Sequence, residues 1–269
     1  MQSNSKRFIF QADAIGVAGQ IIHPFIDVVP VQAASALPVD GGFGSARADG
    51  FNHKDILSFD SAYSEVVGTQ TDDTSETVTL SVVEKFNLLD VVTCDRIVLR
   101  LTAKYPGEYQ DGSGQPAECS IVPTGSRFEG LRVGDKFFEI LEVAPDYFCR
   151  PDRASWAGLQ QALGDDKDRR ILAPLSLPGP DGNPVPLPDP GQRQDVLGFC
   201  IALDKPKPGD VLGAPLRIIV PDFGTVHLGE FFCYPASRLL IMLRVEFDCS
   251  HRGRAVGAHC MIRVQPYPP

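Results

Sequence analysis

Several features that mark secreted and membrane proteins are missing from this sequence. No segment approaches the ~20 consecutive apolar residues of a membrane-spanning helix, and no apolar run near residue 1 is long enough for a secretory signal. Asn4, Asn52, Asn87 and Asn183 are not followed by the Ser or Thr of a glycosylation sequon. We therefore expect a cytoplasmic protein without membrane insertion. Secretion without a signal peptide would leave the same sequence features.

Basic residues are outnumbered by acidic ones. Lys and Arg together number 25 against 34 Asp and Glu, so the formal net charge is -9 and the pI is near 5.0. A general nucleic-acid binder needs a basic face to meet phosphate groups, and adsorption to anionic membranes needs the same positive charge. We therefore expect neither nucleic acid nor a membrane surface as a partner.

The seven cysteines lack the pattern of a disulfide framework. Their number is odd and no Cys-x-x-Cys pair occurs. Most of them lie inside apolar, strand-like segments such as 91-VVTC-94 and 231-FFC-233. We expect most of them to be buried, reduced thiols.

The common catalytic motifs are also missing. There is no Gly-x-Ser-x-Gly and no His-Glu-x-x-His. The Gly-rich segment 38–50 fails both the dinucleotide and the P-loop patterns, and we interpret it as a flexible loop. The acidic pairs at 72–73 and 165–166 lack the spacing of an EF-hand. We expect no cofactor.

What the sequence does contain is a strong period of two. A period of two in 238-RLLIMLRVEFDC-249 places one set of apolar side chains on one face, namely Leu239, Ile241, Leu243, Val245 and Phe247. In 96-RIVLRLTA-103 it places Ile97, Leu99 and Leu101 on one face. This period is typical of half-buried β-strands. It predicts an all-β, antiparallel β-sandwich, either one large sandwich or two tandem ones.

Helix and proline signals divide the chain into three parts. Residues 1–145 form one strand-rich block, with a tight hairpin turn predicted at Gly134-Asp135. Residues 146–194 contain the single short helix, at 152–163, and a proline-rich connector at 174–190 that excludes helix or central strand. Residues 195–269 form a second strand-rich block. This block either completes the first sandwich or forms one of its own.

The last hairpin gathers side chains that can bind a metal. Cys249 and His251 are two residues apart and share a strand face if the strand continues that far, and His259 stands beside Cys260 across the hairpin. Catalytic zinc accepts three protein ligands, which makes Cys249, His251 and His259 the candidate ligands. The interpretation that we favour is core cysteines with loop or edge histidines, and we expect no bound transition metal.

The same hairpin is locally basic within an acidic chain, which suggests an interface. It carries Arg238, Arg244, Arg252, Arg254 and Arg263. A cationic edge can meet an anionic patch on another copy, although charge on an edge strand also serves to block pairing. We take Arg244, Arg252 and Arg254 as interface candidates. The proline-rich segment adds Leu175, Leu177, Val185 and Leu187, unless it packs on its own domain.

Three functions remain open. The first is a non-catalytic β-sandwich that acts through protein–protein contacts and self-assembles as a homo-oligomer. The second is a β-domain that binds a small molecule or carbohydrate, although the only Trp, Trp156, lies on the apolar face of the expected helix and not on an exposed sugar platform. The third is a metal-dependent enzyme that uses the Cys/His hairpin.

Overall fold

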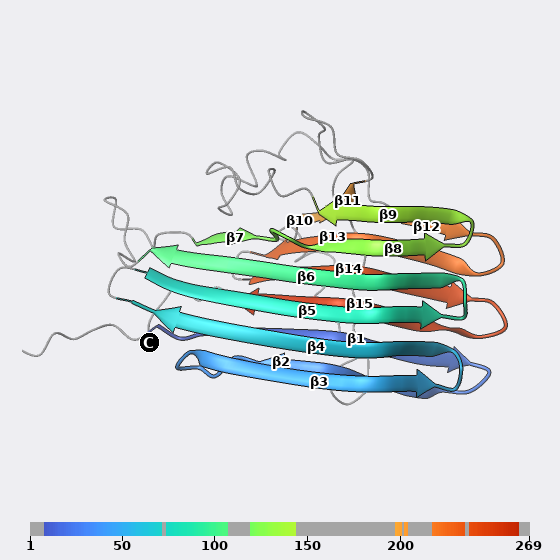
Figure 1. Cartoon of the computed structure of the whole chain (residues 1–269), viewed down its shortest axis with the longest axis horizontal. Helices are drawn as coiled ribbons and strands as arrows, with labels where there is room; N and C mark the ends of the chain where they lie inside the picture. Colours follow the sequence, from blue (N-terminus) through green and yellow to red (C-terminus); the bar gives the residue numbers. More distant parts are fainter. Residues whose placement is uncertain are drawn as a thin grey trace, which may run out of the picture.

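The computed structural model describes the chain in seven ranges, and every regular element within them is a β-strand. The strands form two antiparallel sheets that pack face to face (Figure 1), which confirms the predicted all-β antiparallel class. The described ranges are 8–71, 74–106, 119–143, 197–200, 202–203, 217–234 and 237–263. The helix expected at 152–163 and the proline-rich connector at 174–190 lie outside them.

The first sheet, sheet A, joins strands from both ends of the chain. Its order is β10-β13-β14-β15-β1-β2, and β12 also pairs with β13. Because β15 pairs with β1 from Ala12 opposite Ile262 to His23 opposite Arg252, strands from the expected 1–145 and 195–269 blocks share this sheet. The bounds are β1 (Ala12–His23), β2 (Asp27–Ala36), β10 (Leu197–Cys200), β12 (Arg217–Val220), β13 (Gly224–Tyr234), β14 (Ser237–Asp248) and β15 (Arg252–Arg263).

The second sheet, sheet B, is built mainly from consecutive hairpins. Its order is β11-β9-β8-β6-β5-β4-β3, and β7 also pairs with β6. The predicted turn at Gly134-Asp135 joins β8 to β9. The bounds are β3 (Gly42–His53), β4 (Leu57–Gln70), β5 (Thr74–Leu88), β6 (Val92–Pro106), β7 (Ser120–Val122), β8 (Arg127–Val133), β9 (Lys136–Val143) and β11 (Ala202–Leu203).

The main core lies between the two sheets. Ile97, Leu99 and Leu101 of β6 are fully buried there, as their alternation predicts. Burying one large apolar side chain contributes about 2 kcal/mol. The largest side chains of this core include Phe10, Phe86, Phe128, Phe231, Leu57 and Leu88.

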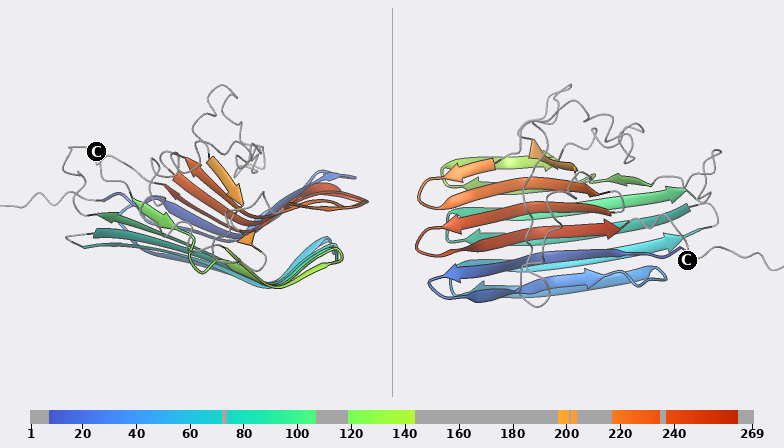
Figure 2. Two further views of the ribbon diagram at one scale, coloured as in Figure 1. Left: turned by 90° about the horizontal axis from the view of Figure 1, so that it is seen from above. Right: turned by 180° about the vertical axis from the view of Figure 1, so that it is seen from behind.

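Both sheets bend along a line that crosses their strands (Figure 2, left). In sheet B the line passes through residues in the left-handed region on alternate strands, where φ is 64° at Gly50, 55° at Lys85 and 62° at Gly130. The strands between and beside them place an acidic residue at the same level, namely Asp60, Asp95 and Glu139. The bend is therefore a row of matched positions and not a kink in one strand.

The bend also shifts the inside–outside alternation. On β5, Val83 and Phe86 both face the core although they are three residues apart, because Lys85 adopts a positive φ between them. On β14 the shift falls at Met242, so Leu239 and Ile241 belong to a separate cluster from Leu243, Val245 and Phe247. The sequence placed all five on one face, and that prediction is wrong because an unbroken period of two was assumed.

Each sheet contains three hairpins whose turns lie at the same end of the molecule (Figure 1). The β1–β2 and β3–β4 turns contact each other: His53 Nε2 lies 2.8 Å from Asp27 Oδ2, and Lys54 Nζ lies 4.4 Å from the centre of the Phe25 ring. The Lys54 ammonium also hydrogen-bonds Asp27, which with His53 holds the pKa of that carboxyl below its ordinary value. The two sheets are thus tied together at their turn end.

Two of these hairpins, β3–β4 and β5–β6, share a sequence pattern. Residues 48–60 and 83–95 align without gaps, with Phe, Asn, Asp and Asp at matching positions. Their turns have the same hydrogen bonds: the backbone N–H of Asp55 donates to Asn52 Oδ1 at 2.9 Å, and that of Asp90 donates to Asn87 Oδ1 at 2.9 Å. Sheet B therefore contains similar hairpins side by side in one row, and β8–β9 is the third member of this row.

The Gly-rich segment interpreted as a loop is mostly an edge strand. Gly42–Gly50 belongs to β3, which pairs with β4 from Gly42 opposite Gly68 to His53 opposite Leu57. The glycines gave a loop signal, but the fold uses one of them for close packing: a Cβ on Gly44 would collide with the Ala36 carbonyl of β2. The loop prediction is wrong for this reason.

Candidate functional site

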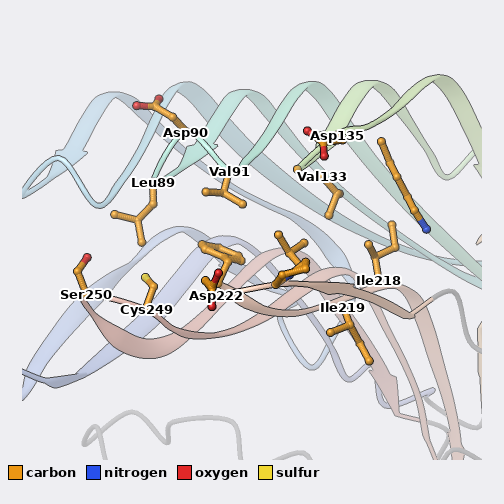
Figure 3. Close-up of a pocket in the computed structure, with 15 residues that line it drawn as sticks. Leu89, Asp90, Val91, Val133, Asp135, Ile218, Ile219, Asp222, Cys249 and Ser250 are labelled. Carbon is orange, nitrogen blue, oxygen red and sulfur yellow. The ribbon is translucent and has the colours of Figure 1, made fainter.

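An open cleft of about 780 Å³ lies at the turn end of the two sheets (Figure 3). The β5–β6 and β8–β9 turns form one wall, and the β12–β13 and β14–β15 turns form the other. Its surface is largely apolar, with Leu89, Val91, Val133, Ile218, Val220 and Phe223 among the lining residues. A concave apolar surface of this size is typical of small-molecule sites.

The polar groups of the cleft do not converge on one point. Asp90, Asp135 and Asp222 come from three different turns and lie apart in Figure 3. Asp90 is engaged within its own turn, where it accepts a hydrogen bond from Asn87 Nδ2 at 2.7 Å. Within the described ranges, no group of three or more His, Cys, Asp or Glu residues is placed to hold a metal ion. The geometry favours an apolar occupant over a charged one.

The structure separates the three candidate metal ligands. Cys249 lines the cleft, and its thiol donates to the backbone carbonyl of His251 at 3.4 Å. His259 lies opposite Ile241 in the middle of β15, whereas the turn follows the Asp248–Arg252 pair. At about 3.3 Å per residue, His259 lies roughly 20 Å from the turn. Cys249 and His251 are neighbours, and His259 is not brought to them.

His259 has its own environment. It is buried, and within the described ranges its Nε2 has no hydrogen-bond partner. Burial lowers the pKa of this imidazole from 6.5 to about 4, because the charged form loses its hydration. The ring is therefore neutral at pH 7, and the adjacent Cys260 is a buried thiol whose pKa is raised by the same cause.

Arg244 does not lie on an exposed basic patch. It is buried and forms a two-point ion pair with Glu230, from Nε at 2.6 Å and from Nη2 at 2.7 Å. Its Nη1 donates to Glu246 at 2.6 Å. The expectation that Arg244 serves as a free cation for another copy is therefore corrected, since it compensates a buried carboxylate on β13.

The other arginines of the hairpin are divided. Arg238 is also buried, and its Nη1 donates to the Ser237 carbonyl at 3.1 Å. Arg252 and Arg254 are exposed near the turn, with Arg252 Nε 4.0 Å from Asp248. These two remain interface candidates. Leu175, Leu177, Val185 and Leu187 lie outside the described residues, as does the side chain of Arg263.

Exposed apolar side chains gather at the two edges of the molecule. One edge is formed by β2, β3, their adjoining turns and the end of β1, and the other by β12 and by β9, whose last two residues pair with β11. Both edges end a sheet, and the larger group is on the first. That group comprises Ile22, Phe25, Ile26, Val28, Val31, Val39 and Phe43, while the second comprises Phe137, Ile140 and Ile219.

Neither the cleft nor the apolar edges leave a local pattern in the sequence. The cleft is assembled from four turns that are far apart in the chain, and no local pattern identifies such a site. The edge strand β3 was hidden by its glycines. The hairpin repeat did leave a detectable signal, because Phe51-Asn52 and Phe86-Asn87 recur 35 residues apart (86 minus 51) with the following aspartates in step.

No helix among the described residues has the length and apolar character needed to cross a membrane.

Comparison with known proteins assigns part of the chain to a family. Neither the curated proteins nor the solved structures contain a match to this chain. A family described as "Domain of unknown function (DUF8256)" matches residues 8–162, a span that contains β1 to β9 and all three hairpins of sheet B. The match covers more than half of the sequence, and the chain belongs to this family.

Proposed function

We propose that this protein is a non-catalytic building block that associates with copies of itself through the edges of its β-sandwich. The observation that carries the proposal is the position of its exposed apolar side chains. Val31 and Phe43, on β2 and β3, are 50% and 58% exposed at one edge, and Phe137 on β9 is 58% exposed at the other. Large apolar side chains exposed at a sheet edge favour association, because the free backbone groups of an edge strand can recruit another strand.

The chemistry of the buried charges supports the same proposal. Arg244 and Glu230 neutralise each other on neighbouring strands, so these buried groups serve the fold. The free thiols of Cys94 and Cys260 are buried. Reduced, unpaired thiols are the usual state in the cytoplasm, and we place the protein there.

The proposal is tested by the mass of the native particle. Light scattering coupled to size exclusion should give a mass above 29.2 kDa that rises with concentration through the micromolar range. Replacing Val31 and Phe43 with Lys should lower that mass. Thr74→Lys is the matched control, because Thr74 is also exposed but lies on β5, two strands away from β3. A particle that stays monomeric throughout contradicts the proposal.

A second candidate is favoured by the cleft. An apolar surface that includes Val91 and Ile218 suits a small apolar ligand. Nile red, an uncharged dye whose emission rises in apolar surroundings, should bind to the native protein. Alkylation of Cys249 with N-ethylmaleimide should block it, because this thiol lines the cleft. A dye signal that is unchanged by alkylation removes this candidate.

A further inference from the structure

We propose that copies join head to tail, so that strand β3 of one copy pairs antiparallel with strand β9 of the next. The β3–β4 hairpin of each copy then becomes the next member of the hairpin row in sheet B of its neighbour. This inference rests on the proposed self-association and specifies its contact. The partner is a second copy of this chain.

The directions of the strands β3 and β9 support this contact. Sheet B is antiparallel throughout, and from β3 to β9 its strands run in three hairpins, β3–β4, β5–β6 and β8–β9. Strands β3 and β9 therefore run in opposite directions. A neighbour placed in the same orientation presents β3 antiparallel to β9, so one repeated step extends the sheet. Such a head-to-tail contact is not closed by a two-fold axis and continues from copy to copy.

The two junctions between hairpins inside sheet B, β4–β5 and β6–β8, already have this arrangement. At β4–β5, Ala62 faces Val83, and at β6–β8, Ile97 faces Phe128. All four side chains are buried in the main core between the sheets. The next junction, β9 with β3, would place Leu141 opposite Ala48. Leu141 is buried and Ala48 packs against the core.

The register that gives this pair also matches the rest of the bend. It sets Ile140 opposite Asp49, both on the outer face, and Phe138 opposite Phe51, which both pack against the main core. It also sets Glu139 opposite Gly50, so the two bend lines become continuous. A shift of one residue would turn core-facing side chains outward on one strand. The bend therefore selects a single register.

The space beside Gly50 also fits the proposed contact. At the β6–β8 junction, the Asp95 carboxylate covers Gly130, and a Cβ there would collide with it. Gly50 occupies the same position in the first hairpin, with φ of 64° against 62° at Gly130. In the part of the chain that the structure describes, a Cβ on Gly50 would meet nothing within 4 Å. Glu139 of the neighbouring copy is the acidic residue that the pattern supplies.

The hairpin turns of sheet B are also linked in a series. The β5–β6 and β8–β9 turns each donate a backbone hydrogen bond to the preceding turn: Leu89 N–H to the Ile56 carbonyl at 2.9 Å, and Gly134 N–H to the Val91 carbonyl at 2.9 Å. In the aligned repeat Lys54 corresponds to Leu89, and it belongs to the first hairpin. Its backbone N–H is placed to donate to the β8–β9 turn of the neighbour, which continues the series.

The length of the contact is limited by β11. This short strand pairs with Glu142 and Val143, at one end of β9. The part of the β9 edge from Lys136 to Leu141 has no partner strand among the described residues, and it faces Ala48 to His53 in the proposed register. Beyond Leu141, the incoming strand competes with β11 for the same edge.

Cysteine cross-linking tests the register directly. In the proposed ladder, Asp49 and Ile140 of neighbouring copies are directly opposite, where Cβ atoms lie about 5 Å apart, within reach of a disulfide after small adjustments. Asp49→Cys and Ile140→Cys are made in separate chains, mixed at a concentration where light scattering shows association, and oxidised with diamide. The mixture should give a disulfide-linked dimer on a non-reducing gel, above the background from the wild-type cysteines. A chain that carries both substitutions should give a ladder of higher species.

The controls separate the failure of this inference from the failure of self-association. Ser45→Cys mixed with Ile140→Cys should not cross-link, because Ser45 is four residues away along β3 (49 minus 45). A dimer formed by Asp49→Cys alone would show a two-fold contact between β3 edges and would overturn the head-to-tail arrangement. Association by light scattering without the Asp49–Ile140 cross-link would overturn this inference and leave self-association standing. A monomer by light scattering would overturn both.

Discussion

The carboxylate of Asp95 on β6 lies directly over the backbone of Gly130 on β8. A Cβ at position 130 would overlap Oδ2 of that carboxylate, and φ at Gly130 is 62°. The same carboxylate accepts a hydrogen bond from Lys85 Nζ at 2.7 Å. One acidic side chain thus spans the bend of sheet B between two left-handed residues, Lys85 and Gly130.

Gly130→Ala should therefore destabilise the protein more than Gly50→Ala. Both changes impose a left-handed conformation on alanine, which costs about 1–2 kcal/mol, but only Gly130→Ala also displaces Asp95. Urea denaturation measures the difference in free energy of unfolding. Adding Asp95→Ala to Gly130→Ala should recover the excess loss. Equal losses for the two single variants, measured on the monomer, would contradict the proposed contact.

Arg244→Met should lower the free energy of unfolding by about 3 kcal/mol, because it leaves Glu230 buried without its counter-charge. Replacing both members, Arg244→Met with Glu230→Gln, should recover much of that loss. Arg252→Met is the matched control. Arg252 is exposed and only 4.0 Å from Asp248, so its removal should change stability little. Calorimetry or urea denaturation gives all three values.

His259 should make the protein less stable as the pH falls below neutrality. Its pKa is about 4 in the folded state against 6.5 for an ordinary histidine, so the unfolded chain binds the proton first. Above pH 6.5 the ring is neutral in both states and does not affect stability. As the pH falls from 6.5 toward 4, protonation of the unfolded chain lowers the free energy of unfolding by about 3 kcal/mol in total. His259→Phe should flatten the slope between pH 6.5 and 5, where few carboxyl groups titrate. A slope that is unchanged in His259→Phe would contradict this assignment.

Among the four described cysteines, Cys249 should react first with a thiol reagent. It lines the open cleft, whereas Cys94 is buried and its pKa is raised to about 12 by burial, which suppresses the reactive thiolate. Titration with a chromogenic disulfide under native conditions should show one fewer fast-reacting thiol in Cys249→Ser than in the wild type. An unchanged fast phase would contradict this order of exposure.

Ala202→Pro should strengthen association if β11 protects the β9 edge. Proline removes a backbone donor and weakens the short β11–β9 pairing at Glu142 and Val143. The free edge of β9 then becomes longer. Sedimentation velocity should show association at several-fold lower protein concentration, while the urea midpoint of the monomer stays close to that of the wild type. A weaker association would assign β11 to the contact itself.

Parts of the fold could be predicted from sequence because they depend on neighbours along the chain. The alternation in 96–103 identified the buried face of β6, and the order Gly134-Asp135 identified a hairpin turn. The same local logic failed at Met242, where the bend of sheet A shifts the alternation, and at 42–50, where glycines serve close packing in β3. Both failures come from contacts with other strands.

The sequence by itself determined that this chain forms half-buried β-strands, because the period of the side chains is a local property. Only the tertiary structure decided that Arg244 neutralises a buried glutamate, that His259 lies far from Cys249, and that four turns enclose a cleft. It also decided which strands end the sheets. Strand order and register depend on pairing between residues far apart in the chain, and hydrophobic burial selects that pairing only when both sheets are present.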